Sequence, residues 1–204
     1  MPAEWELQDA IQITWPSIST DWKDNLEQVE KCFLMISQLV CKYQKLIILY
    51  SPTRNPKKLF NSKELLNIYL IEANYNDTWT RDYAPISTVS NGISTLKDFT
   101  FNGWGNKYPS GLDNKLNLSL LRKGIYINLS KVNFILEGGS IESNGNGIIL
   151  TTKRCLLNSN RNKNYKFEEI ENVEQIKITL AQAELSLLQT KKTQENQLNL
   201  LKLI

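Results

Sequence analysis

Leu46-Ile47-Ile48-Leu49-Tyr50 is the stretch that decides the fold class of this 204-residue chain. Five consecutive apolar residues without polar alternation predict a short strand that is covered on both faces. Residues 21–44, just before it, carry apolar side chains at spacings of three and four. That spacing predicts a helix that buries one stripe, with Thr20 as its N-cap.

The elements after this strand continue the alternation of helix and strand. A shorter helix is expected at 56–66, where Pro56 suits the first helical position, and a strand follows at 68–71. The strand–helix–strand order predicts an α/β fold. Later elements follow from turn residues and apolar spacing: extended stretches at 84–89 and 93–101, a helix at 113–123, strands at 125–129 and 133–136, and a hairpin of 140–143 with 148–152.

The composition changes after Tyr165. The last glycine is Gly147, the last proline is Pro109, and no aromatic residue follows Phe167. The leucines of the remaining segment show no steady heptad, and such a segment buries little surface by itself. We therefore expect 166–204 to be a frayed helix or a disordered tail, and we interpret it as a truncated or frame-shifted end.

Composition and charge exclude several classes of protein. The net charge of +3 is too small to indicate a nucleic-acid partner, and no apolar run approaches the roughly 20 residues of a membrane span. No secretory signal is visible, and Cys32 and Cys41 lie in an apolar helical pattern that indicates buried thiols, so we expect a cytoplasmic protein. The sequence contains no histidine, which argues against a zinc site and excludes Cys-His catalysis within these 204 residues. No metal or cofactor is predicted.

The segment Asn76-Asp77-Thr78-Trp79-Thr80-Arg81-Asp82-Tyr83-Ala84-Pro85 concentrates charged and aromatic residues between two extended stretches. A carboxylate at a strand end can hold a planar guanidinium through paired hydrogen bonds, and a neighbouring Trp can stack on the same cation. The alternative from residue types alone is structural: Asp77 caps a turn, and Arg81 pairs with an acid.

A second candidate is Glu137 in the segment Phe134-Ile135-Leu136-Glu137-Gly138-Gly139-Ser140. An acid before two glycines at the end of an apolar strand indicates a bend or a close approach of another chain segment. Such a glutamate can orient an imidazole, as the acid of a catalytic triad does. The alternative is a glycine bulge with a surface glutamate.

Cys155 and Arg161 lie in a third segment, 155–162, which is rich in asparagine. Asparagine-rich turns with one arginine can bond backbone groups across a loop, so we expect this segment to have a structural role. Nothing nearby in the sequence would lower the pKa of the Cys155 thiol, so we interpret it as an inert buried thiol.

Five segments together carry a family resemblance. "MPAEWE", "TWP", "NDTWTRDYAPI", "DFTFNGWGNKYPS" and "LEGGSIESNGNGIILTTKRCLLNSNRN" resemble the agmatine deiminases of the guanidino-group and peptidyl-arginine deiminase superfamily, in the same order and at matching spacings. The resemblance covers roughly 1–165. It implies a partial pentein, an α/β propeller of ββαβ-type units, with 166–204 as a non-family tail.

The resemblance also implies an activity: hydrolysis of agmatine to N-carbamoylputrescine and ammonia, a step of putrescine biosynthesis. By this match Asp82 grips the guanidinium nitrogens, Trp79 stacks on or encloses the substrate, and Glu137 supports a catalytic histidine. The family's histidine and nucleophilic cysteine belong to segments that these 204 residues do not contain, and Cys155 is not the nucleophile. We therefore expect the chain alone to be inactive.

Three alternatives stay open beside this reading. Peptidyl-arginine is the second substrate candidate. A non-catalytic module could bind guanidinium or polyamines through Asp82 and Trp79, and an interaction protein could use 168–204 as a helix against a partner. The partners that the resemblance allows are a small guanidino substrate and further copies of the same chain.

Overall fold

A computed structural model describes residues 1–165, so the predicted tail at 166–204 lies outside the described residues. The strands are β1 (Ala10–Thr14), β2 (Lys45–Tyr50), β3 (Ile68–Glu72), β4 (Ile86–Ser90), β5 (Ile93–Thr100), β6 (Leu129–Ile135), β7 (Glu142–Ser143) and β8 (Ile149–Leu150). The α-helices are α1 (Leu26–Val40), α2 (Thr80–Tyr83), α3 (Gly103–Asn106), α4 (Asp113–Arg122) and α5 (Lys153–Leu156). Short 3-10 helices are η1 (Lys23–Asn25), η2 (Pro56–Leu59), η3 (Glu64–Leu66) and η4 (Gly138–Ser140).

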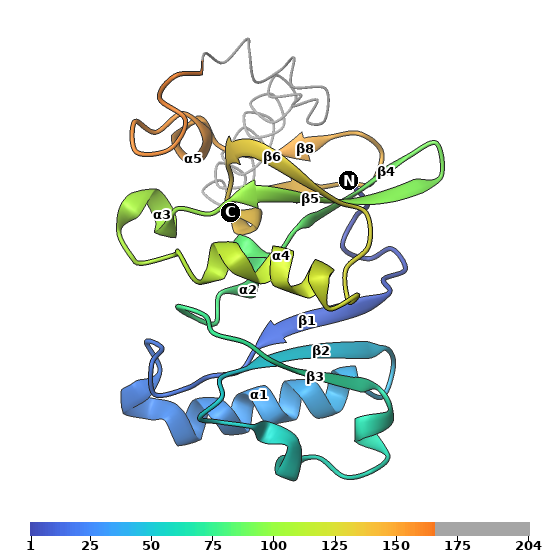
Figure 1. Cartoon of the computed structure of the whole chain (residues 1–204). Helices are drawn as coiled ribbons and strands as arrows, with labels where there is room; N and C mark the ends of the chain where they lie inside the picture. Colours follow the sequence, from blue (N-terminus) through green and yellow to red (C-terminus); the bar gives the residue numbers. More distant parts are fainter. Residues whose placement is uncertain (166–204) are drawn as a thin grey trace, which may run out of the picture.

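Two three-stranded sheets organise the described part of the chain. The first has the order β1-β2-β3 with all strands parallel. In the second, β4 pairs antiparallel with β5, and β5 pairs parallel with β6. Figure 1 shows α1 against the outer face of the first sheet and α4 between the two sheets. The molecule is therefore built from repeated strand-and-helix units, as the predicted α/β class requires.

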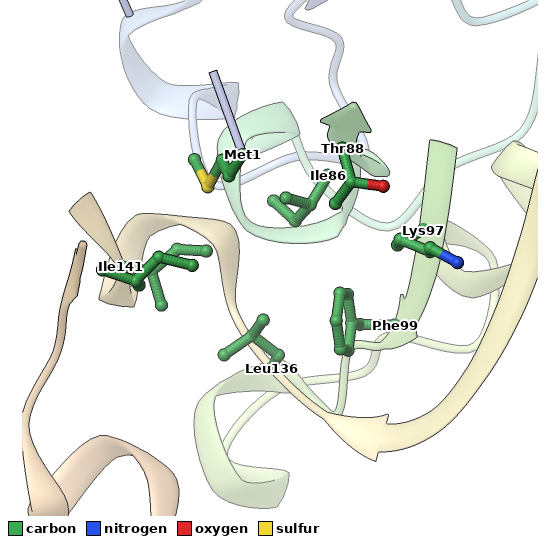
Figure 2. A pocket seen from close by; sticks show the side chains of 8 residues that line it. Met1, Ile86, Thr88, Lys97, Phe99, Leu136 and Ile141 are labelled. Atoms are coloured by element: carbon green, nitrogen blue, oxygen red, sulfur yellow. The ribbon is translucent and has the colours of Figure 1, made fainter. Parts of the chain in front are cut away.

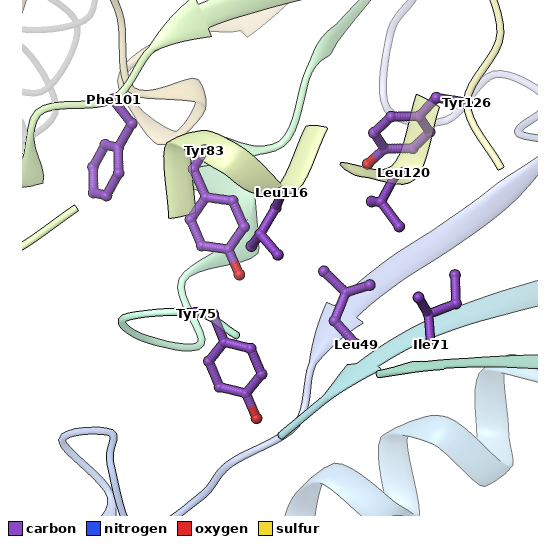
Figure 3. Close-up of a cluster of buried hydrophobic side chains, with 8 residues drawn as sticks. All are labelled: Leu49, Ile71, Tyr75, Tyr83, Phe101, Leu116, Leu120 and Tyr126. Atoms are coloured by element: carbon purple, nitrogen blue, oxygen red, sulfur yellow. The ribbon is translucent and has the colours of Figure 1, made fainter. Parts of the chain in front are cut away.

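The central strand β2 is covered on both faces. Leu46 and Ile48 point into the cluster that also contains Trp15 and the apolar side of α1. Leu49 points to the opposite face and packs in the cluster with Leu116 and Leu120 of α4, as Figure 3 shows. The prediction from the unbroken apolar run is confirmed because each face of the sheet has its own helix.

The predicted helix at 21–44 is present but shorter. α1 begins at Leu26, and the Thr20 hydroxyl donates to the carbonyl of Ser17 over 2.8 Å instead of capping the helix. The prediction that Thr20 is the N-cap is therefore wrong. Cys41 is buried as expected, whereas Cys32 is exposed on the solvent side of α1, which corrects its interpretation as a buried thiol.

Two further predictions fail for local reasons. The helix expected at 56–66 is replaced by η2 and η3, because the Asn61 side chain accepts backbone N–H groups of Lys63 and Glu64 and starts a new turn. The strand expected at 125–129 is instead the closing turn of α4, in which the N–H groups of Ile125 and Tyr126 donate to the carbonyl of Leu120. One strand, β6, replaces the two expected there.

β1, α2, α3 and α5 were not predicted from the sequence, while β3, β4, β5, α4 and the β7–β8 hairpin lie near their predicted positions. None of the helices within residues 1–165 combines the length and the apolar character of a membrane span.

Candidate functional site

The loop that precedes α2 is fixed by a buried carboxylate at the start of α4. Asp113 accepts the N–H of Asn76 over 2.7 Å, and the Asn76 side chain accepts the N–H of Leu112 over 2.8 Å. Asp113 is 1% exposed, and its burial raises its pKa to about 6, although the N–H groups of Asn76 and Asp77 favour the charged form. This reciprocal pair sets where the chain enters the candidate site.

The short helix α2 is attached to the first sheet by two hydroxyl groups. Thr80 donates to the hydroxyl of Thr14 over 2.9 Å, and the Tyr83 hydroxyl contacts the same Thr14 oxygen. The carbonyl of Tyr83 accepts from the buried amide of Asn117 over 2.8 Å. Because Thr80 and Tyr83 are buried, α2 has a fixed orientation, and Asp82 between them is only half-buried.

The carboxylate of Asp82 is held by two N–H groups from distant segments. Gly139 N donates to Oδ1 over 3.1 Å, and the indole Nε1 of Trp104 donates to Oδ2 over 3.2 Å. Burial raises the pKa of Asp82 above its ordinary value, and the two hydrogen bonds partly offset that increase. Asp82 is therefore a half-buried carboxylate in a fixed orientation.

Glu137 is buried where β6 ends. Its side chain is 4% exposed, and Arg161 Nε donates to Oε1 over 2.8 Å and to Oε2 over 3.1 Å. A carboxylate has about four lone-pair sites, so this arginine leaves acceptor capacity on both oxygens. The surface glutamate of the alternative reading is wrong, because the side chain is enclosed.

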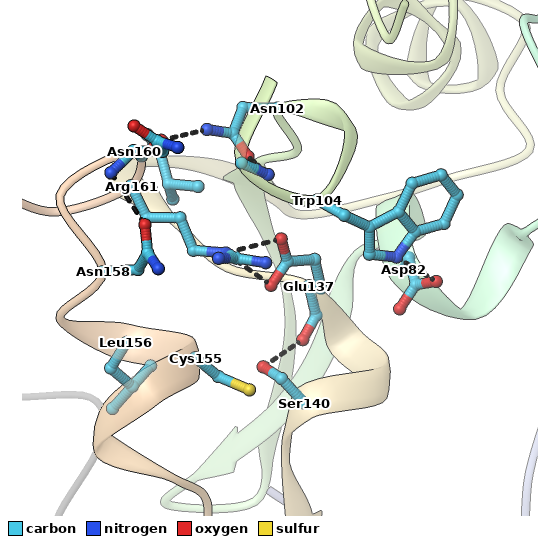
Figure 4. A network of polar contacts seen from close by, with 12 residues as sticks. Asp82, Asn102, Trp104, Glu137, Ser140, Cys155, Leu156, Asn158, Asn160 and Arg161 are labelled. Atoms are coloured by element: carbon cyan, nitrogen blue, oxygen red, sulfur yellow. Dashed lines mark hydrogen bonds and ion pairs between the residues drawn. The ribbon is translucent and has the colours of Figure 1, made fainter. Parts of the chain in front are cut away.

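Contacts between loops join Asp82 and Glu137 into one cluster. Gly139, which bonds Asp82, follows Glu137 by two residues, and Trp104, which also bonds Asp82, precedes Gly105, which lies against the guanidinium of Arg161. Figure 4 shows Asp82, Trp104, Glu137 and Arg161 in this arrangement. The structure thus brings the two predicted acids together.

Trp79 lies in a row of indole rings beside Asp82. Its ring centroid is 5.9 Å from that of Trp22 and 6.2 Å from that of Trp104. The indole N–H of Trp22 donates to Thr78 over 2.7 Å, which anchors one end of the row. Trp79 is 44% exposed, so part of its ring is open to solvent.

Two neighbours of Asp82 have structural contacts. Asp77 accepts the N–H of the adjacent Thr78 over 2.7 Å, whereas α2 itself has no side-chain cap. Arg81 pairs with Glu4 over 2.7 Å, so its charge is already engaged by an acid. Asp82 forms no ion pair within residues 1–165.

The asparagine-rich segment 155–162 bonds backbone groups across a loop, as expected, since the Asn162 side chain bonds the backbone of Ile135 and Leu156. The ion pair of Arg161 with the carboxylate of Glu137 was not predicted. The charge complementarity of one arginine and one buried acid was available in the sequence, but 24 residues separate them and no local pattern connects them. Cys155, expected to be buried, is half-buried.

Two hollows lie near this cluster, and neither is lined by Asp82 or Glu137. One is an apolar space of about 10 Å³ among residues such as Met1, Ile86, Phe99 and Leu136, shown in Figure 2, and it is no larger than one water molecule needs. The other is an open depression beside Phe134 and the segment 161–165. Within the described residues no three Cys, Asp or Glu side chains are grouped as metal ligands would be.

The class of protein follows from the fold, the site and the family match. The chain belongs to the Porphyromonas-type peptidyl-arginine deiminase family, whose model matches residues 1–196. The matched range passes residue 165, and the boundary between a family part and a non-family tail stays a prediction.

Individual relatives agree with this family. The agmatine deiminase of Stutzerimonas stutzeri is 30% identical over 183 residues, which cover 85% of this chain and 48% of that protein. A solved C. jejuni agmatine deiminase, the C315S variant with substrate bound, has a TM-score of 0.77 and 36% identity, covering 86% of this chain and 53% of the other. The Enterococcus faecalis agmatine deiminase has a TM-score of 0.74 and 27% identity, covering 84% of this chain and 48% of the other.

These comparisons confirm the resemblance and the pentein fold class. The chain spans about half the length of the curated relatives it matches.

Proposed function

We propose that this chain provides the guanidinium-binding half of an agmatine deiminase site. The reaction hydrolyses agmatine to N-carbamoylputrescine and ammonia, in the cytoplasm. The supporting observation is Asp82, a half-buried carboxylate that two N–H groups orient and that forms no ion pair within residues 1–165. Such a carboxylate gains most from a ligand that brings its own positive charge and paired N–H groups.

Each site residue has a separate role in this proposal. Asp82 accepts two N–H groups of the guanidinium, and the open part of the Trp79 ring covers the cation or the alkyl chain beside it. Glu137, held by Arg161, orients a histidine imidazole through its remaining acceptor positions. That histidine and the cysteine thiolate that attacks the guanidinium carbon are not among these 204 residues.

The division of roles predicts binding without turnover. A single half-buried carboxylate with one aromatic face supports affinity in roughly the millimolar range. Without a histidine and an activated thiolate in the site, ammonia release from agmatine should not exceed the rate in buffer. Turnover of agmatine by the purified chain would contradict the proposal that this chain binds the guanidinium group without catalysing its hydrolysis.

Binding is tested by NMR titration of the 204-residue chain with agmatine. 1,5-Diaminopentane is the matched control ligand, because it carries two positive charges on a similar alkyl chain and no guanidinium group. We expect agmatine to shift signals around Asp82 and Trp79, and Asp82→Asn to weaken that binding about tenfold. Equal affinity for the two ligands, or an unchanged affinity in Asp82→Asn, would reject the proposal.

A further inference from the structure

The backbone of α3 is left-handed, whereas helices of L-residues are normally right-handed. Four consecutive residues have positive φ angles: Gly103 at 63°, Trp104 at 57°, Gly105 at 84° and Asn106 at 64°. Hydrogen bonds from Asn106 N to the carbonyl of Asn102 (2.8 Å) and from Lys107 N to that of Gly103 (3.0 Å) close the segment. It is one left-handed helical turn, a conformation that L-residues avoid because Cβ approaches the carbonyl oxygen.

Contacts on both sides keep this turn in place. A Cβ atom on Gly103 would overlap the carbonyl oxygen of Tyr108, and one on Gly105 would lie 3.3 Å from Nη1 of Arg161. The Asn102 side chain accepts the N–H of Gly105 over 2.9 Å and donates to the carbonyl of Asn160 over 2.7 Å. Strained backbone persists where its surroundings determine it, and such places cluster at functional sites.

The left-handed turn directs Trp104 toward the candidate site. Its ring makes edge-on contacts with Phe101, Tyr108 and Trp79, at centroid distances of 5.0, 5.7 and 6.2 Å. These contacts leave the indole N–H aimed at Oδ2 of Asp82. A right-handed turn at the same place would send the side chain in another direction, because the Cα–Cβ vector follows the hand of the backbone.

We propose that the left-handed turn Gly103–Asn106 makes Trp104 a positioning residue that fixes the plane of the Asp82 carboxylate for a planar guanidinium. This inference rests on the proposed function of Asp82. Gly139 holds Oδ1 and Trp104 holds Oδ2, so the carboxylate cannot rotate freely. The lone pairs that these two bonds do not use therefore point in a fixed direction. Two parallel N–H groups of a guanidinium need that fixed plane, whereas an ammonium group, which is a point charge, does not. Trp104 therefore selects guanidinium over ammonium.

The test is Trp104→Phe in the full chain. Phenylalanine keeps an aromatic ring against Phe101 and Trp79 and removes the N–H donor. Carbon-detected NMR follows the titration of the Asp82 carboxyl group, and agmatine and 1,5-diaminopentane are titrated in parallel. Trp22→Phe is the matched control for the titration, since it removes an indole N–H that donates to Thr78 and not to Asp82.

We expect the pKa of Asp82 to rise in Trp104→Phe, because a hydrogen bond to the charged form is lost, and to stay unchanged in Trp22→Phe. Agmatine binding should weaken about tenfold and diamine binding by less than about twofold. An unchanged Asp82 titration, or equal losses for both ligands, would overturn the inference. If Trp104→Phe does not fold, 3-benzothienylalanine at position 104 supplies the indole shape without an N–H.

Failure of the inference is distinguishable from failure of the proposed function. If the wild-type chain binds agmatine in preference to the diamine and Trp104→Phe does the same, Asp82 keeps its role and the inference about Trp104 is wrong. If Trp104→Phe shifts the Asp82 titration while the wild-type chain ignores agmatine, Trp104 positions Asp82 as inferred, and the guanidinium function is wrong.

Discussion

Arg161 Nε lies 2.8 Å from Oε1 and 3.1 Å from Oε2 of Glu137, and the side chains of both residues are largely enclosed. A single guanidinium nitrogen therefore contacts both carboxylate oxygens in a place that solvent scarcely reaches. Removing either partner leaves the other as an uncompensated buried charge. The pair therefore attaches the loop 158–161 to Glu137 of the candidate site.

Arg161→Ala is predicted to lower the free energy of unfolding by about 3–5 kcal/mol, the range for breaking a buried ion pair. Urea denaturation followed by circular dichroism measures the loss. Glu4→Ala is the matched control: it removes an exposed ion pair with Arg81, whose two side chains are 45% and 55% exposed, and should cost less than about 1 kcal/mol. Equal losses in the two variants would show that burial does not govern the Arg161 pair.

Gly139→Ala is predicted to weaken agmatine binding about tenfold with little loss of stability. A Cβ atom at this position would lie 2.5 Å from Oδ1 of Asp82, so the carboxylate must rotate out of its hydrogen bond. Gly111→Ala provides the control, since its Cβ would have nothing within 4 Å. NMR titration compares the three proteins, and wild-type affinity in Gly139→Ala would contradict the assigned orientation of Asp82.

Asp113 gives the chain a pH dependence with a definite sign. Its pKa is raised to about 6 in the folded protein from about 3.8. An acid whose pKa is higher in the folded state than in the unfolded state stabilises the fold at low pH. This stability is fully present below the unfolded pKa and is lost as pH rises through the folded pKa. Asp113→Asn removes this loss while its Oδ1 can still accept the N–H of Asn76.

The difference in Tm between Asp113→Asn and the wild-type chain should therefore grow by about 5 °C from pH 4 to pH 7. Thermal denaturation at four pH values in that range measures it. A constant difference across the range would mean that Asp113 does not titrate there.

Asn162 is predicted to be the asparagine whose loss costs most stability at the edge of β6. Its buried amide donates to the carbonyls of Ile135 and Leu156 and accepts the N–H of Ile135, so it replaces a neighbouring strand. Asn162→Ala should cost about 2–3 kcal/mol in urea denaturation, because buried backbone groups lose their partners. Asn144→Ala, which breaks similar bonds in an exposed turn, should cost less than half as much, and the reverse order would reject the assignment.

Sequence reasoning predicted the elements whose signals are local. The apolar run of β2 and the glycine turn of the β7–β8 hairpin both carry their pattern within a few residues. β1 was not predicted because the alternation of Ile11-Gln12-Ile13-Thr14 is too short to stand out, and it is a strand because it pairs along its whole length with β2. Non-local pairing of this kind leaves little trace in one segment.

The candidate site also combines residues that the sequence identified with contacts that it did not predict. Asp82, Trp79 and Glu137 were identified through the family resemblance, and the structure brings the acids together through Gly139. The partner of Arg161 and the left-handed conformation of Trp104 depend on contacts between separate loops. Glycines stand on both sides of Trp104, but only packing against Tyr108 and Arg161 determines the hand of the turn.

The most direct test is a crystal structure of the chain grown with agmatine at saturating concentration. We predict two guanidinium nitrogens within about 3 Å of the two Asp82 carboxylate oxygens, with the ligand against the open part of the Trp79 ring. Guanidinium density elsewhere, with the oxygens of Asp82 bonded only to Gly139 and Trp104, would contradict the proposed site.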